Sequence, residues 1–139
     1  MHAGLPITLR SPVSLSILAE RVYASAYEAL ENDDPRSAER FFGLLALLAP
    51  GDERAWIGLG VSRERSEDWP MAAARYLIGS ALVPESGWCH LGRARALRHL
   101  GHSVEVDEEL DEAESLADDA VLLSAIAAGA SPAVHLSYA

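Results

Sequence analysis

Residues 50–84 read PGDERAWIGLGVSRERSEDWPMAAARYLIGSALVP and carry the clearest structural signal in the chain. The stretch contains two helical segments separated by the turn SED, and each begins at a turn or capping signal. Gly60 in the first helix and Ala72 in the second are small, which lets the two helices cross closely. Trp56 and Tyr76 are large and are expected to fill the space between neighbouring helix pairs. The stretch therefore predicts one helix pair that ends at Pro84.

The same pattern recurs 34 residues earlier and later in the chain. The matching positions are Ala26, Gly60 and Ala94; Ala38, Ala72 and Val106; Phe42, Tyr76 and Leu110; and Pro50 with Pro84. A period of 34 with small residues where two helices cross is typical of tetratricopeptide repeats. No segment alternates apolar and polar residues between turns as a strand does. The sequence therefore predicts an all-α, tetratricopeptide-like superhelix of three helix pairs, with a leading helical segment and a C-terminal capping helix.

Turns and prolines divide the chain into three parts. We expect residues 1–10 to be extended or disordered, residues 11–129 to form the repeat domain, and residues 130–139 to form a flexible tail. The repeats are expected at about residues 19–52, 53–86 and 87–119. The third repeat follows the pattern least faithfully, so its alignment is the weakest of the three.

Capping signals predict where the helices begin. Asp34 followed by Pro35 is a helix start, because the carboxylate accepts from free backbone N–H groups and proline lacks the N–H that would go unpaired. By the same reasoning Ser11 and Ser103 are expected to cap helices, and Asp118-Asp119 is expected to cap a last short helix. The helix that begins at Ser11 meets no glycine or proline beyond its first turn until about residue 31, which exceeds the first helix of a repeat. A leading segment is therefore expected before the first repeat.

Composition and charge exclude several classes of function. The 139 residues carry a formal net charge of −10, and every basic residue is an arginine. This balance argues against nucleic acid and against anionic membrane surfaces, both of which require a basic footprint. The single cysteine, Cys89, excludes an internal disulfide and fits a reducing compartment. No transmembrane stretch and no secretory signal are expected, so the predicted location is cytoplasmic.

The reactive side chains do not form a convincing catalytic or metal site. Cys89 and His90 are adjacent on a predicted helix and therefore point in different directions. His99 and His102 lie on either side of Gly101, in different elements. We therefore expect no enzyme activity, no cofactor and no metal ion.

The first helices of such repeat pairs line a concave face, and the positions beside their core residues point inward. These positions hold Tyr23, Tyr27, Leu30, Arg54, Ile57, Val61, Arg65, Trp88, Leu91, Arg95 and Arg98. Together they predict an apolar strip with aromatic ends and an arginine rim. Such a surface suits an extended peptide, whose side chains enter apolar pockets while arginines bind carbonyls or carboxylates. For Tyr23 and Tyr27 the alternative is packing on the leading helix. For Arg65 and Arg98 it is a solvated position on the outside of a helix.

Several short motifs together resemble a known family. They are AERFF at residues 38–42, PGD at 50–52, WIGLG at 56–60, RY at 75–76, and Gly101 before an acidic helix. With them, residues 27–119 resemble the class II, tetratricopeptide-type chaperones of bacterial type III secretion, which serve the pore-forming translocator proteins. The resemblance implies a cytoplasmic chaperone, often dimeric through its N-terminal region. It also implies that the groove holds an extended translocator segment and keeps it soluble before export.

A second interpretation stays open at this stage. The chain would then be a general tetratricopeptide scaffold that joins folded proteins in an assembly through its convex face or its acidic helix. Residues 105–114 carry the acidic run, which is expected to be a solvated helix face or a contact for a basic partner. Charge reversal at Asp107, Glu108 and Asp111 would impair the scaffold, whereas groove substitutions would impair the chaperone.

Overall fold

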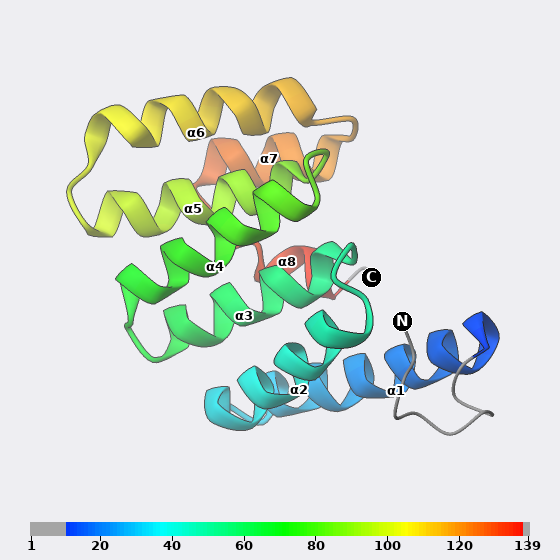
Figure 1. Cartoon of the computed structure of the whole chain (residues 1–139). Coiled ribbons are helices and arrows are strands. Elements are labelled where there is room, and N and C mark those ends of the chain that lie inside the picture. The colour runs from blue at the N-terminus through cyan, green and yellow to red at the C-terminus, as the bar shows by residue number, and fades with distance from the viewer. Residues whose placement is uncertain (1–10, 138–139) are drawn as a thin grey trace.

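The computed structural model describes residues 11–137, which contain eight helices and no strand. The helices are α1 (Pro12–Glu31), α2 (Pro35–Leu48), α3 (Glu53–Arg65), α4 (Trp69–Leu82), α5 (Gly87–His99), α6 (Ser103–Leu116), α7 (Ala120–Ala128) and α8 (Ala133–Leu136). Each helix from α1 to α6 packs on the next, so that three pairs stack in chain order (Figure 1). This arrangement confirms the predicted all-α repeat fold. No helix within the described range is long and apolar enough to cross a bilayer.

Polar caps begin most of the helices. The side chains of Ser11, Asp34 and Asp119 each accept a hydrogen bond from a backbone N–H three residues further on, as predicted. Ser103 does not cap α6, and this prediction was wrong. The N-cap residue is His102, which makes no side-chain capping bond. The turn after α5 is one residue shorter than expected, so Ser103 already lies in the first turn of the helix.

Glycines bring neighbouring helices into contact with aromatic rings. A Cβ at Gly60 would overlap the ring of Tyr76 in the same helix pair. A Cβ at Gly92 would overlap the same ring, and one at Gly58 would overlap the ring of Phe42. Gly58 and Gly92 are themselves 34 residues apart, as are Phe42 and Tyr76. The repeat therefore places one aromatic ring against a glycine of the next pair, where any larger residue would force the helices apart.

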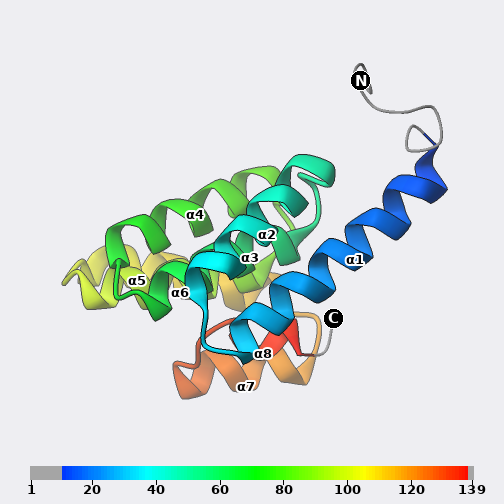
Figure 2. The same cartoon turned by 90° about the horizontal axis from the view of Figure 1, so that it is seen from below.

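The leading segment and the first repeat helix are one continuous helix, α1, of 20 residues. Its first turns extend away from the stacked pairs (Figure 2). Val13 and Ile17 lie there and are 70% and 53% exposed. The expected extended segment at residues 1–10 lies outside the described residues.

The residues after α7 differ from the predicted flexible tail. Gly129 ends α7 in the left-handed conformation, with φ of 63°, and turns the chain back toward the repeats. The short helix α8 follows, and both Pro132 and Leu136 are buried. Because this turn brings apolar side chains onto the first helices of the pairs, residues 130–137 pack on the repeats. Figure 2 shows α7 and α8 on the side opposite α2 and α4.

Candidate functional site

The predicted apolar strip exists, but it is covered. Residues from α1, α3 and α5 form one cluster with Leu136 of α8, and each is at most 7% exposed. They are Tyr23, Leu30, Ile57, Val61, Trp88 and Leu91. Tyr27 is half-buried at the margin of the same cluster. The structure therefore brings the predicted apolar residues together, with a segment of the chain itself lying on them.

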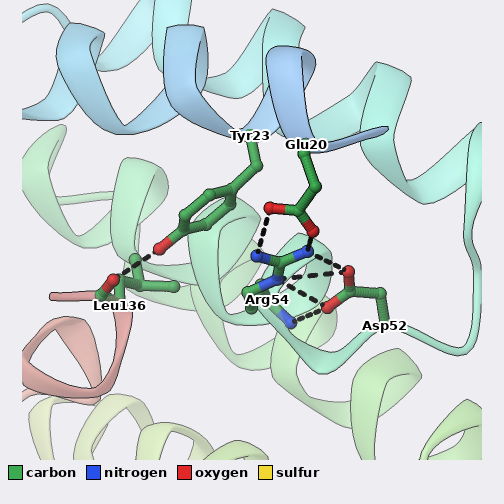
Figure 3. Close-up of polar contacts among 5 residues, drawn as sticks. All are labelled: Glu20, Tyr23, Asp52, Arg54 and Leu136. Atoms are coloured by element: carbon green, nitrogen blue, oxygen red, sulfur yellow. Dashed lines mark hydrogen bonds and ion pairs between the residues drawn. The ribbon is translucent and has the colours of Figure 1, made fainter. Parts of the chain in front are cut away.

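The covering segment consists of residues 129–137, and two groove side chains donate hydrogen bonds to its backbone. The hydroxyl of Tyr23 donates to the carbonyl of Leu136 at 2.5 Å (Figure 3). Burial raises the pKa of Tyr23 to about 12, so the hydroxyl keeps its proton over the physiological range. At the other end of the segment, Nη1 of Arg95 donates to the carbonyl of Gly129 at 3.0 Å. Both contacts recognise main chain, which any polypeptide offers.

A third contact holds a side chain of the segment. The ring of His135 stacks on Trp88, with 4.7 Å between the ring centroids. Its Nε2 lies 2.6 Å from Oε1 of Glu53 at the start of α3. The sequence pattern does not indicate Glu53 or His135 as site residues. Only the tertiary position of α8 makes them partners, and no spacing in the sequence reports it.

Arg54 forms ion pairs with carboxylates of the protein itself. Its guanidinium bridges Glu20 of α1 and Asp52 at the start of α3, at 2.7 and 2.8 Å (Figure 3). It also lies over the ring of Tyr23, 4.2 Å from the centroid. The hydrogen bond from Arg54 lowers the pKa of Glu20. Arg54 therefore joins α1 to α3 and orients the tyrosine that donates to the covering segment.

Arg95 is also paired. Its Nε lies 2.8 Å from the buried carboxylate of Glu64, which accepts from the hydroxyl of Tyr76 as well. Burial, followed by the Glu64 charge, raises the pKa of Tyr76 well above its usual value. Oγ of Ser131, in the covering segment, donates to Glu64 at 3.4 Å. Glu64 is not among the predicted site residues, although a carboxylate four residues after Gly60 lies on the same buried side of α3.

The other two predicted arginines lie at the edge of the site. Arg65 and Arg98 are exposed. Nη1 of Arg65 reaches the carbonyl of Leu30 at 3.4 Å, across α1 and α3. The predicted arginine rim therefore divides into Arg54 and Arg95, which are held by carboxylates, and two exposed residues.

Open cavities flank the covering segment on both sides. One of about 240 Å³ lies beside Trp69, with Arg65 and Arg95 on its wall. The other, of about 400 Å³, is lined by Trp88, His135 and several carboxylates. These carboxylates are Glu53, Glu85, Asp118 and Asp119. The second cavity is acidic and therefore suits a basic side chain.

The reactive residues noted in the sequence have structural roles. Cys89 is fully buried, and burial raises the pKa of its thiol to about 12, which disfavours the nucleophilic thiolate. His90 contacts Glu109 at 2.6 Å, and Arg93 binds the other carboxylate oxygen. These contacts join α5 to α6. Within residues 11–137 no three His, Cys, Asp or Glu side chains are grouped so as to hold a metal ion.

No protein-family model and no curated protein sequence matches the chain. Solved structures match it over nearly its whole length. The chain is similar to the type III secretion translocator chaperone SycD of Yersinia enterocolitica, with a TM-score of 0.77 and 20% identity over 98% of this chain and 100% of that one. A structure of SycD with a peptide of the translocator YopD gives a TM-score of 0.74 and 21% identity over 93% and 100%.

A third structure is that of PcrH in complex with the chaperone binding region of PopB. It gives a TM-score of 0.75 and 19% identity over 91% of this chain and 98% of that one. The likeness extends over nearly the whole of each chain. The chain therefore has the helical-repeat fold of the translocator chaperones SycD and PcrH.

Proposed function

We propose that the protein is a cytoplasmic, non-enzymatic chaperone that binds an extended segment of a secreted, translocator-type client on the face of α1, α3 and α5. One observation carries this proposal: a stretch of polypeptide already lies on that face. Tyr23 and Arg95 bind its carbonyls, and the apolar cluster buries its Leu136. A surface that takes main chain at fixed points and one large side chain in an apolar site is built for peptides.

The likenesses support the same function. SycD has been crystallised with a peptide of the translocator YopD, and PcrH with the chaperone binding regions of PopB and PopD. Among the eleven predicted partner-binding residues, we assign the apolar ones and Tyr27 to client side chains. Arg95 would bind a client carbonyl, Arg54 would position Tyr23, and Arg65 and Arg98 would contact the client at the rim. Keeping an apolar client segment covered would prevent its aggregation before export.

Co-expression with a candidate translocator tests this proposal. Tyr27→Ala together with Val61→Ser removes apolar contact area from the groove, so less client should remain soluble and co-purify. Leu82→Ser is the matched control, because Leu82 lies on α4 and is 50% exposed. Circular dichroism would establish that both variants are folded. The proposal fails if the groove variant retains the client as well as the wild type does.

A second candidate function rests on the opposite side of the molecule. The outer helices α2 and α4 expose several large apolar side chains: Phe41, Leu44, Leu47, Leu77, Ile78 and Leu82. Such a surface is typical of a protein interface. The scaffold hypothesis therefore assigns partner binding to α2 and α4. Leu47→Asp with Leu77→Asp would abolish partner capture under this hypothesis and leave it intact under the chaperone hypothesis.

A further inference from the structure

We propose that residues 129–137 are an internal ligand of the groove, which a client segment displaces. The protein would then have a closed state, in which its own C-terminal segment occupies the groove, and an open state that binds the client. This inference rests on the proposed function, because the displacing ligand is the client. It also indicates the chemistry of the client, since residues 129–137 and the client segment would share one binding surface.

The internal ligand is held at a small number of points. Its first residue is bound through the carbonyl of Gly129, and its last buried residue through both the carbonyl and the side chain of Leu136. Between them, His135 stacks on an indole ring and pairs with Glu53. The groove side chains at these points come from α1, α3 and α5. Every one of these contacts could be made by another polypeptide lying along the same path.

The segment depends on the groove for its order. A helix of four residues is too short to be stable alone, because the cost of its first turn exceeds what one or two hydrogen bonds return. By contrast, α7 buries Leu122 and Ala125 and contacts both α5 and α6. Gly129, in the left-handed conformation, joins the two. Residues 130–137 can therefore leave the groove while α7 and the three helix pairs stay folded.

The contacts of the internal ligand indicate the chemistry of the client. The site of Leu136 takes a large aliphatic side chain. The preceding position, beside Trp88 and Glu53, takes an imidazole or a cation, which an indole face and a carboxylate both attract. The acidic cavity adjoins this position, with Glu85 and Asp118 on its wall. We therefore infer a client segment with a basic residue next to a large aliphatic one.

An internal ligand weakens the apparent affinity of every external one. The apparent dissociation constant equals the intrinsic value divided by the fraction of molecules in the open state. A groove that is open in about one molecule in a hundred would bind its client about 100-fold more weakly than an empty groove. Releasing the segment should therefore tighten the binding of any peptide that uses the groove, without a change in the groove itself.

A peptide binding experiment on the full-length chain tests this inference. The probe is a fluorescein-labelled synthetic peptide of residues 129–137, GASPAVHLS, measured by fluorescence anisotropy. Leu136→Ser and His135→Ala, made in the protein, remove contacts of the segment and leave the groove residues unchanged. Both variants should bind the peptide at least 10-fold more tightly than the wild type. Val134→Ser is the matched control, since Val134 lies on the same helix but is 40% exposed.

The outcomes distinguish a failure of the internal-ligand proposal from a failure of the proposed chaperone function. If neither variant gains affinity, or if Val134→Ser gains as much, the segment is not an internal ligand. His135→Ala decides the matter should Leu136→Ser prove unfolded by thermal melting, because the imidazole is only half-buried. A peptide carrying the Leu136→Ser change should bind no variant tightly.

If the released variants bind the peptide but no translocator co-purifies, the internal ligand stands and the proposed client is wrong. If the variants do not bind the peptide more tightly than the wild type but the translocator still co-purifies, only the internal-ligand proposal is overturned.

Discussion

At the scale of single residues, the glycines opposite the aromatic rings set the distance between helix pairs. Gly58 faces the ring of Phe42, and its Cα leaves no room for a further carbon. The sequence period identified Gly60 but not this position. Gly58 belongs to the WIGLG motif, and it shares the spacing of 34 with Gly92. Which of two glycines in one turn of a helix faces the ring depends on helix rotation, and that is set by packing.

Gly58→Ala should lower the free energy of unfolding by about 1–3 kcal/mol, because the new methyl group would force Phe42 or the helix aside. Gly43→Ala is the control, since nothing lies within 4 Å of a Cβ at that position of α2. The control should raise stability by about 0.5–1 kcal/mol, as alanine favours helix over glycine. Urea denaturation measures both. Equal effects of the two changes would contradict the close approach at Gly58.

Glu109 makes stability depend on pH in the acidic range. Burial opposes its charge, but the hydrogen bond from His90 and the charge of Arg93 hold its pKa below the usual 4.5. The pKa of Glu109 is therefore lower in the folded state than in the unfolded state. Its contribution to the free energy of unfolding is complete above the unfolded-state pKa and is lost as the pH falls through the folded-state pKa. Glu109→Gln should therefore cost about 1–3 kcal/mol at pH 7, and the difference from wild type should shrink below about pH 4.5.

Urea denaturation of both proteins between pH 7 and pH 3 measures this difference. Glu108→Gln is the control, because Glu108 is the exposed neighbour on α6. A difference between wild type and Glu109→Gln that stays constant down to pH 3 would show that the ion cluster does not contribute through its charge.

At the scale of helices, the length of each helix decided whether the sequence could predict it. The six helices of the pairs span 13 to 20 residues each, long enough for a hydrophobic period and a cap to be recognised. The helix α8 spans four residues, shows no period, and exists only because the repeats bind it. The apolar residues of the groove were therefore predictable, whereas their occupant, His135 and Leu136, was not.

Asp119 should control the order of α7. Its carboxylate accepts from the backbone N–H of Leu122 at 2.9 Å, so Asp119→Ala should destabilise the helix by about 1 kcal/mol. Hydrogen exchange of the α7 amides should become faster, while that of α3 amides stays unchanged. Asp118→Ala is the control, since it removes a carboxylate of the same charge that caps nothing. Faster exchange in both variants would assign the effect to charge instead of capping.

At the scale of the whole molecule, the described residues form a stack with one helix that extends beyond it. The first turns of α1 carry exposed Val13 and Ile17, and a dimer interface in this region stays a prediction from the sequence. We expect Ile17→Arg to shift a dimer toward monomer in sedimentation velocity, because the charge would be buried in the interface. Arg21→Ala, at an exposed position one turn further along α1, should leave the mass unchanged. A wild-type protein that sediments as a monomer at every concentration would exclude this interface.

The single thiol makes the seam between the second and third helix pairs observable. Cys89 lies in α5 beneath Gly79 of α4, where even an added Cβ would come within 2.7 Å of its sulfur. A thiol-modifying reagent can therefore reach the sulfur only when α4 and α5 separate. The rate of modification under native conditions would report how often this seam opens. Because the chain has one cysteine, labelling gives a single mass shift per molecule, and the labelled fraction over time would measure the opening with and without a candidate client.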